Sequence, residues 1–222
     1  MSRKSLLSIA DLSTDDILSL IESAISLKQG KGKAYLEGKS LALLFEKPSL
    51  RTRVSFEIAM WQLGGNTIYL SPDEVGLGKR EQIPDIARTL SRYVNSIVAR
   101  TFSHQVLEVL AHYASVPVIN GLSDQEHPCQ ALGDLLTIYE KKGRLKGLRL
   151  AFIGDSNNVA NSLLLATSLV GIDFTIASPP GYQTKKEILR HAQEFASQSG
   201  THIFCTSEPH LAAKDVDIVY TD

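Results

Sequence analysis

The sequence predicts an α/β protein with two doubly wound parallel-sheet domains that face each other across a cleft. Short apolar runs, each typical of a buried parallel strand, alternate with segments whose apolar residues recur at helical spacing. This alternation holds in both halves of the chain, and a stretch rich in Lys, Gly and Arg at 141–147 separates them. The predicted domains are therefore residues 1–142 and 147–222.

The elements of the first half follow from local patterns. A helix is predicted after the polar and acidic residues 11–16, and the apolar run Leu41–Phe45 is predicted to be a buried strand. A second helix is predicted because Val54, Ile58 and Trp61 recur at helical spacing. The further elements predicted here are strand 67–70, an exposed loop over 71–81, helix 86–93, strand 96–99, helix 107–113, strand 116–119 and a helix that opens at 127.

The second half predicts the same alternation. Its predicted elements are strand 148–153, a helix after residue 158, strand 174–177, helix 185–198 and strands 202–205 and 216–220. The carboxyl ends of such parallel strands are where ligands bind in open α/β sheets, so polar residues at those ends are site candidates.

Composition narrows the classes of function. The chain has 222 residues, 43% of them hydrophobic and 21% charged, with a formal net charge of -1, so neither disorder nor an anionic nucleic-acid or membrane partner is favoured. Cys129 and Cys205 give neither a disulfide framework nor metal-ligand spacing. The N-terminus lacks a signal or transit pattern, and no apolar run approaches the ~20 residues that span a bilayer. A cytoplasmic enzyme without metal or redox cofactor is expected.

The segment that follows the strand Leu41–Phe45 predicts an anion site. Ser49, Arg51 and Thr52 lie where a strand gives way to a helix N-terminus, whose unpaired N–H groups and dipole favour an anion. Arg51 offers a planar fork of donors, and Leu50 offers only its backbone N–H. The alternatives are that Ser49 simply caps the helix and that Arg53 pairs with Glu57 one turn on.

Two further positions carry candidate chemistry. Arg100 ends the strand 96–99 and is a site candidate on that ground, with a surface ion pair as the alternative. His127, Pro128, Cys129 and Gln130 open a helix, so that an imidazole and an amide can be presented together to a small carbonyl or carbamoyl group.

These motifs resemble those of the transcarbamoylases, the aspartate/ornithine carbamoyltransferase family. Ser49 to Arg53 match its Ser-x-Arg-Thr-Arg signature, and the preceding Phe-Glu-Lys is similar to ornithine rather than aspartate carbamoyltransferases. His127 to Gln130 match its His-Pro-x-Gln motif, and 154–158 resemble its Gly-Asp-x-Asn-Asn segment. The resemblance covers nearly all of the chain.

The resemblance implies transfer of the carbamoyl group from carbamoyl phosphate to the δ-amine of L-ornithine, giving L-citrulline and phosphate. It implies a homotrimer with shared active sites, in which the loop over 71–81 reaches a neighbouring subunit. Arg100, His127 and Thr52 would be catalytic. Carbamoyl phosphate would contact Ser49, Leu50, Arg51, Thr52, Arg100, His127, Pro128, Cys129 and Gln130. L-Ornithine would contact Asn158 and Asp222.

The sequence departs from the family pattern in places. Leu50 stands where Thr is commonest, and Gly76 where many relatives carry Gln or His. The chain stops at Asp222, before the family's Ser-Met-Gly loop and His-Cys-Leu-Pro segment, so a C-terminally truncated product is expected.

Other functions remain open from the residues. One is a carbamoyltransferase for another amine such as putrescine, and another is a non-catalytic fragment that binds carbamoyl phosphate. A third is dinucleotide binding at Gly154, which is disfavoured because the second and third fingerprint glycines are missing and Asp155 would repel pyrophosphate. For Asn158 the alternative is a structural role, in which its side chain caps the following helix. The direction of the pathway in which the enzyme works stays open as well.

Overall fold

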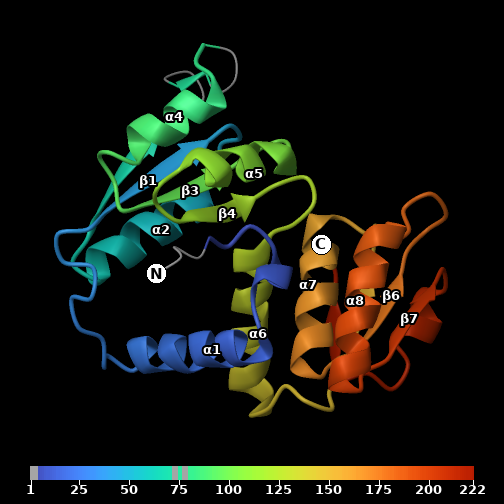
Figure 1. Cartoon of the computed structure of the whole chain (residues 1–222). Helices are drawn as coiled ribbons and strands as arrows, with labels where there is room; N and C mark the ends of the chain where they lie inside the picture. Colours follow the sequence, from blue (N-terminus) through green and yellow to red (C-terminus); the bar gives the residue numbers. More distant parts are fainter. Residues whose placement is uncertain (1–4, 72–74, 77–79) are drawn as a thin grey trace. The chain divides into compact units, whose positions relative to one another are not determined.

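Parallel strands alternate with helices along the whole chain (Figure 1). The computed structural model describes residues 5–71, 75–76 and 80–222, and the chain divides into two units. Unit 1 holds the residues up to Asp11 and Ser23–Gln125, and unit 2 holds Leu12–Glu22 and Glu126–Asp222. Helix α1 (Thr14–Lys28) contributes its first turns to unit 2 and its last to unit 1.

Unit 1 is built on a parallel sheet in the order β2-β1-β3-β4. Its strands are β1 (Ser40–Phe45), β2 (Asn66–Leu70), β3 (Ser96–Arg100) and β4 (Val118–Leu122). Its helices are α2 (Leu50–Gln62), α4 (Ile83–Leu90) and α5 (His104–Tyr113).

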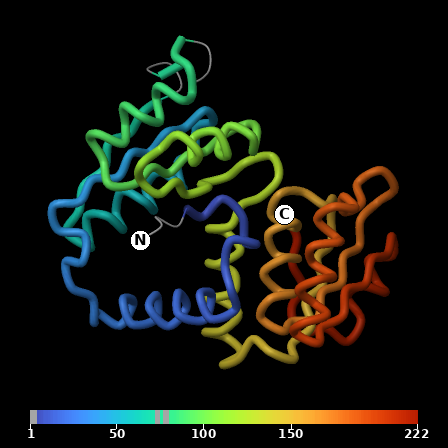
Figure 2. Tube along the Cα trace, viewed as in Figure 1, coloured from blue at the N-terminus to red at the C-terminus, as the bar shows by residue number. Residues whose placement is uncertain are grey.

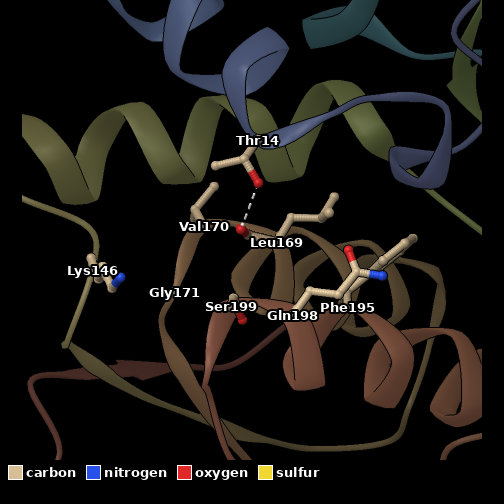
Figure 3. A pocket seen from close by; sticks show the side chains of 8 residues that line it. All are labelled: Thr14, Lys146, Leu169, Val170, Gly171, Phe195, Gln198 and Ser199. Carbon is tan, nitrogen blue, oxygen red and sulfur yellow. Dashed lines mark hydrogen bonds between the residues drawn. The ribbon is translucent and has the colours of Figure 1, made fainter.

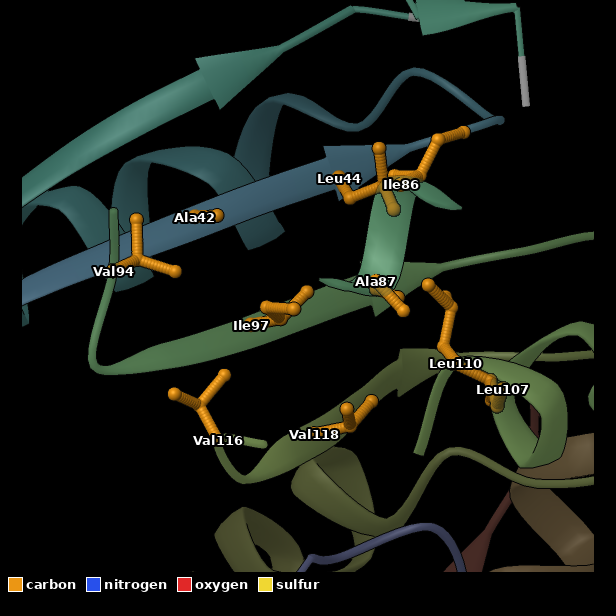
Figure 4. Packing of buried hydrophobic residues seen from close by; sticks show 11 residues of the cluster. Ala42, Leu44, Ile86, Ala87, Val94, Ile97, Leu107, Leu110, Val116 and Val118 are labelled. Carbon is orange, nitrogen blue, oxygen red and sulfur yellow. The ribbon is translucent and has the colours of Figure 1, made fainter. Parts of the chain in front are cut away.

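Alternate residues of β1 face opposite sides of the unit 1 sheet, as the two-residue period of a strand requires. Ala42 and Leu44 pack with the residues of α4 and α5 in one buried cluster (Figure 4). Leu43 and Phe45 pack with Met60 of α2 in a second cluster. The unit is therefore doubly wound, and its central strand is buried on both faces, which explains the continuous apolar run.

Unit 2 repeats this plan with a sheet in the order β7-β6-β5-β8. Its residues from Glu126 onward are coloured from yellow-green to red along the sequence in Figure 2. Its strands are β5 (Arg149–Ile153), β6 (Asp173–Ala177), β7 (Ile203–Thr206) and β8 (Ile218–Tyr220). Its helices are α6 (Pro128–Lys142), α7 (Asn158–Val170), α8 (Lys186–Ser199) and the short α9 (Pro209–Ala212). Helix α7 is buried along nearly its whole length between α6 and α8.

Both sheets contain a point where the strand order reverses. In unit 1 the chain leaves β1 toward β2 on one side and returns to β3 on the other. In unit 2, β6 and β7 lie on one side of β5 and β8 on the other. Ligands bind outside the carboxyl ends of the strands at such points, so each unit offers one favoured binding position.

The predicted α/β class and parallel sheets are confirmed, but two elements differ in detail and one predicted loop is described only in part. The strand expected at 116–119 is β4, which begins at Val118 and runs through Asn120 and Gly121. Tyr93, expected within a helix, lies beyond the end of α4 and is exposed. The loop expected at 71–81 falls partly on residues 72–74 and 77–79, which lie outside the described residues.

None of the helices formed by the described residues has the length and apolar character needed to cross a membrane. In the same part of the chain, no group of three or more His, Cys, Asp or Glu side chains is placed to hold a metal ion.

Candidate functional site

Ser49 and Thr52 form a hydroxyl pair at the N-terminus of α2. Ser49 is the N-cap residue, and its Oγ accepts a hydrogen bond from the Thr52 backbone N at 3.4 Å. The Ser49 hydroxyl in turn donates to Thr52 Oγ1 at 3.0 Å. The alternative that Ser49 caps the helix is thus confirmed, and the cap also fixes the Thr52 side chain.

Arg100, the last residue of β3, contacts this hydroxyl pair through its guanidinium group. Its position pairs with Phe45 of β1, and its Nη1 donates to Thr52 Oγ1 at 3.4 Å. Nε of Arg100 is a buried donor with no hydrogen-bond partner in the described part of the chain. Burial lowers the pKa of Arg100, because desolvation disfavours the charged form. Among the described residues Arg100 forms no ion pair, so the surface ion-pair alternative finds no support in that part of the chain.

Ser49, Thr52 and Arg100 together form the unit 1 cluster. They lie at the carboxyl ends of β1 and β3, where the strand order of unit 1 reverses. Glu46 holds the same edge together, because its backbone N donates to the Arg100 carbonyl and its carboxylate accepts from the Phe102 N, both within 2.9 Å. An anion at this point would meet hydroxyl, guanidinium and helix N-terminal donors together.

The other residues of the signature divide into two groups. Arg51 is exposed in the first turn of α2 and forms no hydrogen bond or ion pair with the described residues, which leaves its donors available. Leu50 is 79% exposed and can supply only its backbone N–H. Arg53 instead pairs with Glu57 at 2.9 Å and lies over the Tyr69 ring, 3.8 Å from its centre. The helix-surface alternative for Arg53 is therefore confirmed.

His127 begins the corresponding site of unit 2. It is the N-cap residue of α6, and its backbone N donates to Ser162 Oγ at 2.9 Å. The buried Ser162 hydroxyl donates to Glu126 at 3.1 Å, which ties the start of α6 to α7. Pro128 is buried at the first helical position, where its missing N–H costs nothing.

Cys129 and Gln130 follow on the first turn of α6. Burial raises the pKa of the Cys129 thiol to about 11, so the thiol is protonated at neutral pH and is not a nucleophile. Gln130 is exposed, and its Nε2 donates to Asp134 Oδ1 at 3.0 Å. The amide is thereby held in one orientation.

The carboxyl ends of β5 and β8 bring Asn157 and Asp222 together. Asn157 caps α7 by accepting from the backbone N of Val159 and of Ala160, at 2.9 and 3.0 Å. Its Nδ2 donates to Asp222 Oδ2 at 3.0 Å. The cap of α7 is therefore Asn157, and Asn158 is the first residue of the helix, so the cap alternative for Asn158 is wrong.

A cavity of about 220 Å³ lies at the opposite, amino edge of the unit 2 sheet (Figure 3). The C-terminal turns of α7 and α8 line it together with Lys146 and Thr14, whose hydroxyl donates to the Leu169 carbonyl at 2.9 Å. None of the candidate site residues lines this cavity. Its position at the amino ends of the strands is unlike that of α/β ligand sites.

Comparison with known proteins gives this geometry a context. Residues 4–140 match the carbamoyl-P binding domain of the aspartate/ornithine carbamoyltransferases, and residues 146–222 match their Asp/Orn binding domain. The chain belongs to the aspartate/ornithine carbamoyltransferase family.

Individual relatives agree with the family match. The chain is 52% identical to an ornithine carbamoyltransferase of Anoxybacillus flavithermus over 99% of its own length and 71% of the relative's. It is 50% identical to one of Bacillus subtilis, over 99% of this chain and 69% of the relative. The solved ornithine carbamoyltransferase of Pyrococcus furiosus superposes with a TM-score of 0.96 at 47% identity, over 99% of this chain and 71% of that one.

Gly76 lies in a backbone conformation that restricts which residue fits there. Gly76 has φ +55°, a conformation that favours glycine, and a Cβ there would lie 2.9 Å from the Arg80 Cβ. A side chain at this position would therefore be strained and would require a local shift.

The structure adds residues that the sequence prediction missed. Glu46, Asp134, Asn157, Ser162 and Tyr220 all contact predicted site residues or fix the elements that carry them. Asp134 could have been found, since it follows Gln130 by one helical turn and shares its face. Tyr220 and Ser162 are distant in sequence from their partners and carried no local signal.

Proposed function

We propose that this protein transfers the carbamoyl group of carbamoyl phosphate to the δ-amine of L-ornithine, giving L-citrulline and phosphate. The observation that carries the proposal is the unit 1 cluster, in which Ser49, Thr52 and Arg100 meet at the reversal of strand order. It lies within the part of the chain that matches the carbamoyl-P binding domain. The names of the relatives support ornithine as the acceptor.

The phosphate of the donor is proposed to bind Ser49, Arg51, Thr52 and the backbone N–H of Leu50. Thr52 Oγ1 accepts hydrogen bonds from Ser49 and Arg100, so its own proton is not used by either of them and is free to be donated. Arg51 adds a fork of donors whose geometry suits phosphate. The helix N-terminus favours the negative charge of the departing phosphate.

The carbamoyl group is proposed to bind Arg100, His127 and Thr52 through its oxygen, which would share the single Thr52 hydroxyl proton with the phosphate, and the Pro128–Cys129–Gln130 turn would lie beside it. The neutral δ-amine attacks the carbonyl carbon, the bond from that carbon to the phosphate oxygen breaks, and the departing phosphate takes up the proton that the amine loses. Negative charge develops on the carbonyl oxygen during attack, and donors aimed there lower the barrier. The protonated Cys129 takes no covalent part in this scheme.

The acceptor is proposed to bind Asn158 and Asp222 in unit 2. Asp222 is exposed at the carboxyl end of the sheet, and its hydrogen bond from Asn157 fixes one oxygen. A carboxylate suits the α-ammonium group of ornithine, while the δ-amine must lose its proton from a pKa near ~10 before it attacks.

The domain assignment is also a proposal. Residues 1–142 would bind the donor and residues 147–222 the acceptor, which the matches to 4–140 and 146–222 support. Helix α6 belongs to unit 2 by its packing on α7, although it lies within the matched carbamoyl-P binding domain.

A homotrimer with shared active sites is proposed on the basis of α2. Leu50, Val54, Ile58 and Trp61 form an exposed apolar stripe along this helix, with exposures of 79%, 46%, 47% and 74%. Such a stripe next to the candidate site is typical of a surface that another protein covers. We also propose a cytoplasmic location, in keeping with two cysteines that are not joined in a disulfide.

The test is product formation from carbamoyl phosphate with three acceptors: L-ornithine, putrescine and L-aspartate. The proposal predicts citrulline from L-ornithine and little product from the other two. Carbamoylputrescine as the main product would identify the alternative amine. Binding of carbamoyl phosphate without product from any acceptor would leave only the donor-binding function.

A further inference from the structure

Gln130 and Tyr220 share the carboxylate of Asp134 in unit 2. Gln130 Nε2 donates to Asp134 Oδ1 at 3.0 Å, and the Tyr220 hydroxyl donates to Asp134 Oδ2 at 3.1 Å. Each oxygen of the carboxylate thus has a different partner. Gln130 lies on the first turn of α6 and Tyr220 on β8, so Asp134 joins a helix to a strand.

The chemistry of a carboxylate decides how the Gln130 amide is oriented. An ionised carboxylate only accepts hydrogen bonds, so the NH₂ group of the amide must face Asp134 and its carbonyl oxygen must face away. An asparagine in place of Asp134 would remove this preference, because its own amide can pair with either end of the Gln130 amide.

Tyr220 holds the second oxygen from a rigid position. Its ring stacks on Phe152 with the centroids 5.6 Å apart and the planes 17° from parallel. Burial and the neighbouring charge of Asp134 raise the pKa of Tyr220, so its hydroxyl remains a donor. The pKa of Asp134 is raised, chiefly by burial and also by the charge of Asp222, and the hydrogen bonds from Gln130 and Tyr220 to its oxygens oppose that rise.

We propose that Asp134 is a positioning residue that makes the protein select carbamoyl phosphate over other acyl phosphates. It turns the Gln130 carbonyl oxygen toward the donor, where that oxygen accepts a hydrogen bond from the carbamoyl NH₂ group. This inference rests on the proposed function, since it assumes that Gln130 lies beside the carbamoyl group.

Acetyl phosphate is the analogue that distinguishes a fixed Gln130 amide from one that is free to turn. Acetyl phosphate has the same acyl phosphate group and nearly the same shape, but it carries a methyl group where carbamoyl phosphate carries NH₂. A fixed acceptor would be left without a donor opposite that methyl group, and such a site rejects the analogue strongly. An amide free to turn would lose most of this discrimination.

The experiment is calorimetric titration of carbamoyl phosphate and of acetyl phosphate into the wild-type chain and into Asp134→Asn. The measured quantity is the ratio of the two dissociation constants. We expect the wild-type ratio to favour carbamoyl phosphate, and Asp134→Asn to reduce that ratio about tenfold while inorganic phosphate binds unchanged. Asp85→Asn, which removes a surface carboxylate from an ion pair on α4, is the matched control and should keep the ratio.

A second variant guards against loss of folding. Tyr220→Phe keeps the ring that stacks on Phe152 and removes one tether of Asp134, so a smaller reduction of the ratio is expected. A purely structural role of Asp134 would weaken both acyl phosphates equally, and an unchanged ratio in both variants would overturn the inference. A wild-type chain that does not prefer carbamoyl phosphate at all would instead overturn the assignment of the donor under the proposed function.

Discussion

Thr52 is the residue at which the hydrogen bonds of the unit 1 cluster meet. Its oxygen accepts from the Ser49 hydroxyl and from Arg100 Nη1, at 3.0 and 3.4 Å. A hydroxyl has one proton, and these two bonds do not use it. The contacts within the protein therefore orient Thr52 as a donor.

Replacing Thr52 by valine keeps the shape of the side chain and removes the hydroxyl. We expect carbamoyl phosphate to bind about ten- to a hundredfold more weakly, because a hydrogen bond to a charged group contributes about 1.5–3 kcal/mol. Calorimetry measures this difference. Thr137→Val, which removes an exposed hydroxyl bonded to the Gly133 carbonyl of α6, is the control, and equal effects of the two changes would contradict the role of Thr52.

The two cysteines should differ in their response to pH. The pKa of Cys129 is raised to about 11 by burial, so its thiolate is scarce at pH 8 and increases only as the pH approaches 11. Iodoacetamide at pH 8 is therefore expected to modify the exposed Cys205 well before Cys129. Peptide mass mapping gives the order, and both thiols should react at similar rates in denaturant. Faster labelling of Cys129 in the folded chain would contradict its assignment as an inert thiol.

The site residues predicted from the sequence differ in how far local patterns could place them. Ser49 and Thr52 were predictable because a helix N-terminus is recognisable from a few adjacent residues. Arg53 belongs to the same motif but turns to Glu57 and Tyr69, since a residue one turn into the helix faces its own neighbours. The contact of Arg100 with Thr52 depends on the pairing of β1 with β3, which no local pattern specifies.

At the scale of the element, the two adjacent asparagines in the turn between β5 and α7 have different roles. Asn157 uses its oxygen to cap α7 and its NH₂ group to hold Asp222. Asn158 begins the helix and is the residue proposed to contact the acceptor. The residue types alone could not assign these tasks, because either asparagine is a good cap.

Asn157→Ala and Asn158→Ala test this division. Loss of the cap is expected to lower the free energy of unfolding by about 1 kcal/mol for Asn157→Ala, and a smaller loss is expected for Asn158→Ala, because Asn158 does not cap the helix. Denaturant unfolding measures both. A larger loss for Asn158→Ala than for Asn157→Ala would show that the cap has been misassigned.

The elements themselves were predictable where burial imposes a clear pattern. Strand β1 is buried on both faces and reads as a continuous apolar run, whereas β4 begins after Pro117 and carries Asn120 and Gly121 within it. The buried Asn120 donates from Nδ2 to the Leu7 carbonyl at 2.8 Å. A polar residue satisfied by a distant segment makes a strand resemble a loop in the sequence.

At the scale of the whole molecule, α2 is the helix whose apolar side chains are exposed although their spacing is typical of a buried face. The apolar residues that predicted this helix, Val54, Ile58 and Trp61, are exposed, and its core contacts come from Phe56 and Met60 instead. Helical spacing predicts that a helix has an apolar face, but it does not predict which part of the protein, or which other protein, covers that face. The proposed trimer supplies a reason for this stripe.

Ile58→Glu combined with Trp61→Ala should therefore prevent self-association. A charge in a covered apolar surface is costly, so we expect the variant to sediment as a monomer where the wild type sediments as a trimer. Leu211→Glu, which places a charge at an exposed apolar position of unit 2, is the control. A wild-type chain that sediments as a monomer would remove the case for this interface.

The central claim is that the donor binds through its phosphate at the N-terminus of α2, and titration of carbamoyl phosphate tests it most directly. The wild-type chain should show saturable binding, and Arg51→Ala should weaken it at least tenfold through loss of a charge-assisted contact. Arg88→Ala, a surface arginine paired with Asp85 on α4, should bind as the wild type does. Equal affinity of Arg51→Ala and the wild type, or no binding by the folded wild-type chain, would contradict the claim.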